Sequence, residues 1–134
     1  MWTVSVLGPS PRELRGGAMG RGSPDGTRIA FIPSGANDRE IWVMGSQGDN
    51  PRKVLAVGEN EVLLNMRWSP DGLRLAYSRQ RGEDSFQHSI ETCDLKGASR
   101  TVVVSADPGL VLHDFLWLPE GRIVYAPGGI AWLK

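Results

Sequence analysis

One short turn sequence occurs three times in this chain, and its spacing constrains the fold more than any other feature. Ser23-Pro24-Asp25-Gly26 returns as Ser69-Pro70-Asp71-Gly72, and a weaker copy follows at Leu118-Pro119-Glu120-Gly121. The first proline lies 46 residues before the second, which lies 49 residues before the third. Internal repeats with a period of roughly 40 to 50 residues are typical of stacked or radially arranged supersecondary units. We therefore expect a repeat protein.

Each residue of this turn has a conformational role. Proline fixes φ near about −65° at the first central position, aspartate tolerates the next position, and glycine takes the positive φ that closes a hairpin. Each copy therefore joins two antiparallel strands. The runs after the first two copies, Ile29-Ala30-Phe31 and Arg74-Leu75-Ala76-Tyr77, are nearly continuous in apolar residues. Such runs predict strands that are buried on both faces.

A second unit repeats between the turns, which raises the number of strands in each period to about four. It occupies residues 2–14, 42–54 and 91–103, with Gly8, Gly48 and Gly97 in register. No stretch keeps the apolar spacing of an amphipathic helix over three turns. We predict an all-β fold of β-propeller blades, each a four-stranded antiparallel sheet.

The repeat bounds divide the chain into about two full blades and two partial ones. They are a partial blade at 1–16, blades at 17–60 and 61–106, and a partial blade at 107–134. The chain opens and ends inside a blade, so we expect it to be a fragment of a larger propeller. An open arc exposes strand edges and apolar blade faces, which predicts self-association through those edges.

The composition is typical of a folded domain, and the formal net charge is +0. The 134 residues are 40% hydrophobic and 22% charged, and 15 basic residues balance 15 acidic ones. This balance argues against binding to nucleic acid or an anionic membrane, both of which select an excess of Lys and Arg. No apolar run reaches the roughly 18 residues of a membrane span, and we see no signal peptide. Cys93 is the only cysteine, so it cannot form an internal disulfide.

The stretches 68–77 and 41–44 resemble the TolB-type, WD40-like β-propeller repeat. In that family a motif W-S-P-D-G-x-x-I-A-F/Y precedes a strand of the form I-W/Y-V-M. The chain is also similar to C-terminal propellers of large bacterial multidomain proteins, some of which carry a serine/threonine protein kinase domain and others a winged-helix domain. The resemblance implies the fold and an interaction platform. TolB-like proteins are periplasmic, but nothing in this sequence indicates the compartment.

Three functions remain open from the sequence. The first is a non-catalytic protein-interaction or sensor module of a larger bacterial protein, with a protein or peptide partner. The alternative is the propeller portion of a prolyl oligopeptidase-like serine peptidase whose hydrolase domain is encoded elsewhere. The third is a gene remnant without a partner. We expect no enzymatic activity in this chain, since G-x-S-x-G, P-loop and kinase motifs are missing from its sequence.

Few residues are candidates for a site. We predict no cofactor and no metal, because His88 and Cys93 are five residues apart on a presumed strand and so point to opposite faces. The turn residues Asp25 and Asp71 are expected to serve their own hairpins, and the tryptophans to pack between blades. A charged stretch over 79–85 is expected to be a solvated hairpin loop that contacts a partner, through Arg79, Arg81, Glu83 and Asp84.

Overall fold

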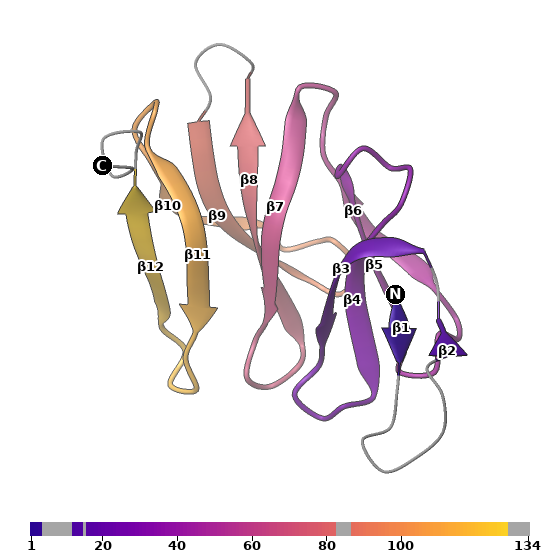
Figure 1. Ribbon diagram of the computed structural model, residues 1–134. Helices are drawn as coiled ribbons and strands as arrows, with labels where there is room; N and C mark the ends of the chain where they lie inside the picture. Colours follow the sequence, from indigo (N-terminus) through magenta and orange to yellow (C-terminus); the bar gives the residue numbers. More distant parts are fainter. Residues whose placement is uncertain (4–11, 15, 83–86, 129–134) are drawn as a thin grey trace.

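The computed structural model describes residues 1–3, 12–14, 16–82 and 87–128, and within them the chain forms strands joined by turns (Figure 1). This described part contains no helix long and apolar enough to cross a membrane. The strands are β1 (Trp2–Thr3), β2 (Arg12–Glu13), β3 (Gly17–Gly22), β4 (Arg28–Pro33), β5 (Glu40–Gly45), β6 (Arg52–Ala56), β7 (Glu61–Trp68), β8 (Arg74–Arg81), β9 (Gln87–Asp94), β10 (Thr101–Ser105), β11 (Val111–Trp117) and β12 (Ile123–Gly128).

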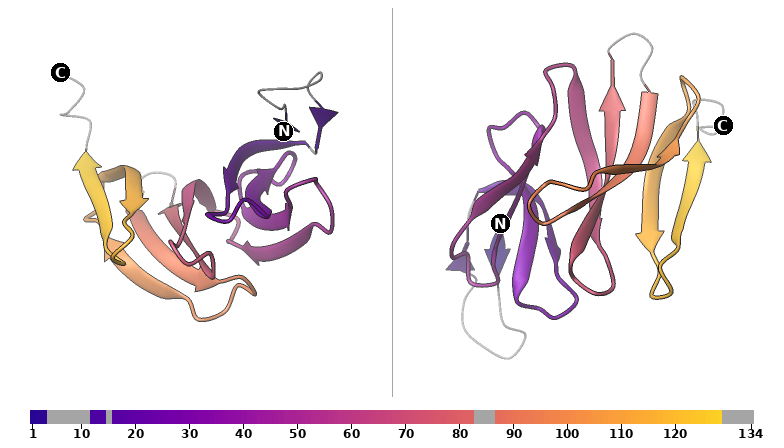
Figure 2. Two further views of the ribbon diagram at one scale, coloured as in Figure 1. Left: turned by 90° about the horizontal axis from the view of Figure 1, so that it is seen from below. Right: turned by 180° about the vertical axis from the view of Figure 1, so that it is seen from behind.

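These strands form antiparallel sheets whose members follow one another in the chain. Two sheets have four strands, in the orders β3-β4-β5-β6 and β7-β8-β9-β10, and two have two strands, β1-β2 and β11-β12. Seen from below, the larger sheets and β11-β12 succeed one another along an arc, with β3, β7 and β11 on its inner side (Figure 2). The predicted fold class, an all-β arrangement of four-stranded propeller blades, is confirmed.

The strand register shows which part of a blade each small sheet represents. In β1-β2, Trp2 is opposite Glu13, and 40 residues later Trp42 is opposite Lys53 in β5-β6. The pair β1-β2 thus corresponds to the third and fourth strands of a blade. In β11-β12, Trp117 is opposite Ile123, as Trp68 is opposite Leu75 in β7-β8. The pair β11-β12 therefore corresponds to the first and second strands.

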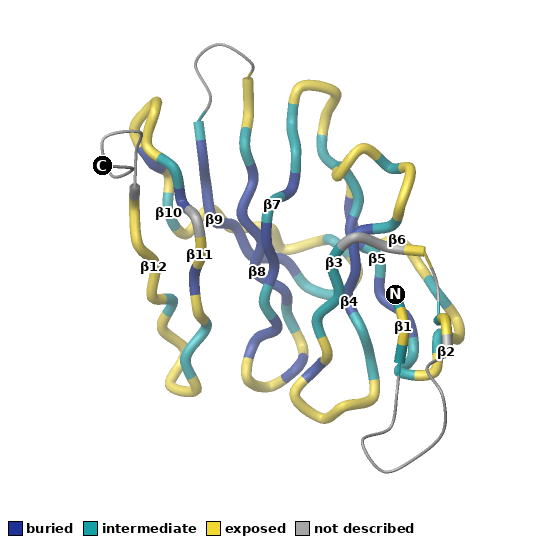
Figure 3. The backbone as a smooth tube through the Cα atoms, viewed as in Figure 1, coloured by how far each residue is buried: buried dark blue, intermediate teal, exposed yellow. Residues whose placement is uncertain are grey.

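The core lies between the sheets, where apolar faces pack against each other. Figure 3 shows buried positions along β7, β8 and β9 in the middle of the molecule. We call the contact of β3–β6 with β7–β10 the first boundary and the contact of β7–β10 with β11-β12 the second boundary. The first boundary buries Ala30, Ile32, Ile41, Val43, Val54, Leu55, Leu63, Met66, Trp68, Leu75, Tyr77 and Cys93. The second buries Ala76, Ile90, Ala106, Leu112 and Phe115. Face-to-face burial of this kind holds successive blades together, because a single sheet cannot cover both of its own faces.

The first strand of the β3–β6 sheet is rich in glycine. Residues 17–22 nevertheless form β3 and pair with β4 from Gly17 opposite Pro33 to Gly22 opposite Ile29. The strand pairing shifts register between Gly17 and Met19. Glycines have no side chains that could stabilise a strand by packing. The backbone hydrogen bonds with β4 therefore hold β3 in place.

Candidate binding face at the inner strands

The first two turn motifs fold in the same way around a serine and an aspartate. The Ser23 hydroxyl donates to Asp25 Oδ1 at 2.7 Å and accepts from the Arg28 amide at 3.0 Å. One repeat later, Ser69 donates to Asp71 Oδ1 at 2.6 Å and accepts from the Arg74 amide at 2.9 Å. Gly26 and Gly72 have φ of 76° and 73°, which favours glycine. The identical sequence thus gives identical local structure.

Hydrogen bonds hold the turn aspartates in their ionised form. Donation from the Ser23 hydroxyl, and from the amide and hydroxyl of Thr27, lowers the pKa of Asp25 from 3.8 to about 2. The pKa of Asp71 is also lowered, chiefly by the Ser69 hydroxyl and then by the Leu73 amide. A carboxylate that several donors stabilise is a poor general acid or base near neutral pH. Both aspartates serve the geometry of their turns.

The third turn copy keeps one of the two backbone hydrogen bonds and has different side-chain contacts. Its Leu118 amide donates to the carbonyl four residues on, whereas the Ser23 and Ser69 amides donate to carbonyls five residues on. The Gly121 amide donates to the Leu118 carbonyl at 2.9 Å, as in the other copies, and Gly121 has φ of 93°. Leu118 offers no hydroxyl, so Glu120 accepts from Arg122 Nη2 at 2.6 Å instead. This hydrogen bond lowers the pKa of Glu120. The third copy therefore forms a turn although it lacks the serine of the first two copies.

Arg28 connects the first two blades across the first boundary. Its guanidinium carbon lies 5.3 Å from the centroid of the Trp68 ring, and its Nη2 donates to the Gly72 carbonyl at 2.9 Å. The Trp68 indole in turn donates from Nε1 to the Arg21 carbonyl at 2.8 Å. At the outer side of the same boundary, Arg52 Nη1 donates to the Leu95 carbonyl at 2.6 Å. Directional polar contacts therefore supplement the apolar packing here.

A polar ladder crosses the three inner strands, and it is the strongest candidate for a site. Arg21 of β3 donates to Asn65 Oδ1 of β7 at 3.1 Å, and Asn65 donates from Nδ2 to Asp114 Oδ1 of β11 at 2.7 Å. Arg67 of β7 donates to Asp114 Oδ1 at 2.8 Å and to Asn65 Oδ1 at 3.1 Å. We call Arg21, Asn65, Arg67 and Asp114 the inner-strand ladder. It links side chains that are up to 93 residues apart in the sequence.

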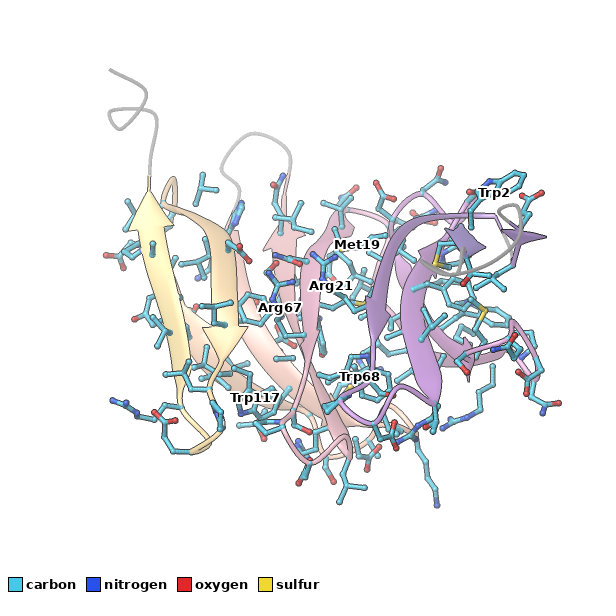
Figure 4. All side chains as sticks on the ribbon, turned by 60° about the horizontal axis from the view of Figure 1, so that its bottom comes forward. Trp2, Met19, Arg21, Arg67, Trp68 and Trp117 are labelled. Carbon is cyan, nitrogen blue, oxygen red and sulfur yellow. The ribbon has the colours of Figure 1, made fainter. Side chains whose placement is uncertain are left out.

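The ladder presents polar groups on the inner side of the arc. Figure 4 labels Arg21 and Arg67 on neighbouring inner strands. The Arg67 guanidinium also lies 5.9 Å from the centroid of the Phe115 ring. Asn65 is buried, whereas Asp114 keeps 63% of its side chain exposed. Two guanidiniums, one amide and one carboxylate can exchange hydrogen bonds with peptide groups and carboxylates of a partner.

The expected partner-contact loop at 79–85 needs correction. Arg79 and Arg81 lie in β8, where Arg79 is only 9% exposed. Arg79 Nη2 lies 3.1 Å from Glu91 Oε2 of β9, because the β8–β9 register places these residues on the same face of the sheet. Arg79 is thus a buried ion-pair partner and not a loop residue. Glu83 and Asp84 lie outside the described residues.

Glu91 is the centre of a buried polar cluster. It accepts from the Ser89 hydroxyl at 2.8 Å and from the Tyr77 hydroxyl at 3.2 Å, and Arg81 lies 3.6 Å away. Burial, followed by the charge of Glu91, raises the pKa of Tyr77. No sequence pattern points to this cluster, because the pairing of Arg79 with Glu91 depends on strand register. Both carboxylate oxygens of Glu91 have partners within β8 and β9, which indicates a structural role.

The described residues hold no group of three or more metal-ligating side chains. Cys93 is fully buried, and burial raises the pKa of its thiol to about 11, which is unfavourable for a nucleophile or a metal ligand. His88 is buried at the second boundary, where its Nδ1 accepts from the Leu112 amide at 3.2 Å and its Nε2 contacts Gln80 Oε1 at 3.2 Å. These contacts fix the ring between β8, β9 and β11.

Sequence comparison shows similarity to proteins named Tol-Pal system protein TolB. No model of a known protein family matches the chain. Over an alignment of 65 positions, which covers 45% of this chain and 14% of the relative, the chain is 42% identical to the Tol-Pal system protein TolB of Xanthomonas oryzae pv. oryzae. The matches to the curated relatives considered span 11% to 16% of their length, so this chain spans a small part of those proteins.

Solved structures share the fold. A TolB-type protein from Agrobacterium tumefaciens superposes with a TM-score of 0.64 at 14% identity, over 87% of this chain and 44% of that one. An oligogalacturonate lyase in complex with manganese superposes with a TM-score of 0.54 at 22% identity, over 71% of this chain and 25% of that one. At these identities the likeness concerns the fold alone.

Proposed function

Because the chain consists of β-propeller blades of the TolB type, we propose that it is a non-catalytic protein-interaction module. Its protein or peptide partner would bind along the inner strands β3, β7 and β11. The inner-strand ladder carries this proposal, since it gathers polar side chains from three successive blades around Asp114, whose side chain is 63% exposed. Extended segments that lie across strands of different blades are recognised by such convergent polar groups together with nearby apolar surface.

Three of the described carboxylates and the thiol support a role without catalysis. Asp25 and Asp71 are engaged by their own turns, and Cys93 is buried. Glu91 is enclosed by an arginine, a tyrosine and a serine. The alternative, the propeller portion of a peptidase, remains a prediction that no observation in this structure favours.

We also propose that the blades span 1–16, 17–60, 61–106 and 107–134. Their resemblance to C-terminal propellers of bacterial multidomain proteins supports a place in a larger propeller of a larger bacterial protein, such as one with a kinase domain. Self-association is proposed through β11-β12, where Leu116 is 53% exposed and Val124 48% exposed.

Selection of a displayed library of random peptides against the full chain tests the binding proposal. We expect an enriched peptide family whose affinity falls by about tenfold or more in Arg67→Ala and in Asp114→Ala, as charged hydrogen bonds predict. Arg100→Ala, on an exposed turn outside the inner strands, is the matched control and should leave the affinity unchanged. An absence of enrichment, or peptides that bind all three variants equally, would refute binding at the ladder.

Light scattering over a range of protein concentrations tests self-association. A mass that rises with concentration in the wild type, and stays monomeric in the double variant Leu116→Lys/Val124→Lys, is the expected result. An unchanged concentration dependence in the double variant would exclude this face as the contact.

A further inference from the structure

The two boundaries between blades carry the same three residues in equivalent repeat positions. Across the first boundary these are Arg28, Trp68 and Gly72, and across the second they are Arg74, Trp117 and Gly121. Each arginine follows its turn, and each tryptophan precedes the next turn along the chain. The repeat alone therefore predicts that Arg74 stacks on Trp117 and donates to Gly121, as Arg28 does with Trp68 and Gly72.

The second boundary does not contain this contact. Arg74 Nη2 donates to Thr92 Oγ1 at 3.2 Å and to the Ser99 carbonyl at 2.8 Å, both within its own blade. A groove of about 280 Å³ lies where the arginine would be, and its lining includes Asp71, Arg74, Trp117, Glu120 and Gly121. Trp68 and Trp117 stand at the same end of their blades (Figure 4).

We propose that this groove binds the guanidinium group of an arginine side chain from a protein partner, in the position that Arg28 takes on Trp68. The indole face of Trp117 would stack on the planar guanidinium, and the Gly121 carbonyl would accept a hydrogen bond from it. The choice of a protein as the source of the arginine rests on the proposed function. The choice of guanidinium rests on the first boundary, where the same set of groups holds one.

The other groups of the groove fit a cation. The carboxylates of Asp71 and Glu120 line it, and hydrogen bonds lower the pKa of both, so both are ionised at neutral pH. Arg74 also lines the groove, but its Nη2 is turned to Thr92 and Ser99. A planar fork of donors satisfies an indole face and a carbonyl together, which the compact ammonium of lysine does less well.

Indole ¹H–¹⁵N spectra of the full chain, titrated with N-acetyl-arginine amide, test the proposal. The Trp117 signal is assigned from the variant Trp117→Phe, and the Trp68 signal is an internal control because Arg28 already covers that ring. N-acetyl-citrulline amide has nearly the same shape but no charge. We expect a saturable shift of the Trp117 signal with arginine, a stationary Trp68 signal, and at least about tenfold weaker binding of citrulline.

Three outcomes would overturn the proposal. They are a Trp117 signal that does not respond, equal responses to arginine and citrulline, and a response seen in Arg74→Ala but not in the wild type. The last would mean that Arg74 itself fills the groove in solution. The result is separable from the proposed function, because the titration needs no partner and the peptide selection reports on the inner-strand ladder, away from this groove.

Discussion

The guanidinium of Arg28 covers the indole of Trp68, 5.3 Å from its centroid, while the same indole donates a hydrogen bond to the Arg21 carbonyl. A single ring therefore contacts two strands of the neighbouring blade, one through its face and the other through its edge. The loss of either contact should weaken the junction between these blades, and each can be removed separately.

Arg28→Ala is expected to lower the free energy of unfolding by about 1–2 kcal/mol, the sum of a cation–π contact and a hydrogen bond from a charged donor. Urea unfolding monitored by tryptophan fluorescence measures it. Arg28→Lys keeps the charge but loses the planar fork, so we expect an intermediate loss. Equal stability of wild type and Arg28→Ala would show that the contact contributes nothing.

Trp68→Phe is expected to cost about 1–2 kcal/mol, because it removes the indole donor and leaves the partly buried Arg21 carbonyl without that partner. Trp42→Phe is the matched control. Trp42 is only partly buried, and its indole donates to Glu40 in the same strand. Thermal or urea unfolding should show a clearly smaller effect for Trp42→Phe. Losses of the same size would contradict a special role for the boundary indole.

Glu91→Ala should destabilise the chain by about 3–5 kcal/mol, because it leaves the buried Arg79 without its nearest carboxylate. The double variant Arg79→Met/Glu91→Leu removes both charges and should recover most of that loss. Urea unfolding of the two single variants and the double variant gives the coupling energy. A double variant as unstable as the sum of the single ones would argue against a direct interaction.

Stability should fall in acid through Asp25. Its folded pKa of about 2 lies below the ordinary 3.8, so its contribution is complete above the ordinary pKa and is lost as pH falls through the folded one. Urea midpoints between pH 5 and about 2 should therefore decline less in Asp25→Asn than in the wild type. Glu59→Gln, on an exposed loop, is the control and should follow the wild type. Parallel declines in all three proteins would rule out this linkage.

Cys93 should resist alkylation in the native protein. Its thiol is fully buried and its pKa of about 11 leaves little thiolate at pH 8. Iodoacetamide labelling followed by mass spectrometry should show modification only when urea unfolds the chain. Rapid labelling of the native protein would mean that β9 opens readily.

The turns and the strand order could be predicted from the sequence because both are local properties. Ser23 and Asp25 are two residues apart, and the hydrogen bonds they make stay within the turn. The position of Arg79 could not be predicted in this way, because a charged stretch looks solvated until strand register places it opposite Ser89 and beside Glu91.

The inner-strand ladder and the difference between the two boundaries also could not be predicted from the sequence. Asn65 and Asp114 are joined only after successive blades have packed. Arg28 and Arg74 have the same place in the repeat but different acceptors, one in the next blade and one in its own. The choice between those acceptors depends on tertiary distances that a repeat pattern does not contain.

The sequential order of strands within each sheet has a consequence for how the chain folds. Because β3 to β6 and β7 to β10 each pair with their nearest neighbours in the chain, most strand contacts close short loops. Short loop closure is entropically inexpensive and fast, so each sheet can form early and separately. The cooperativity between sheets then depends on contacts such as Arg28 with Trp68, and hydrogen exchange would divide the chain into units that open one after another when those contacts are removed.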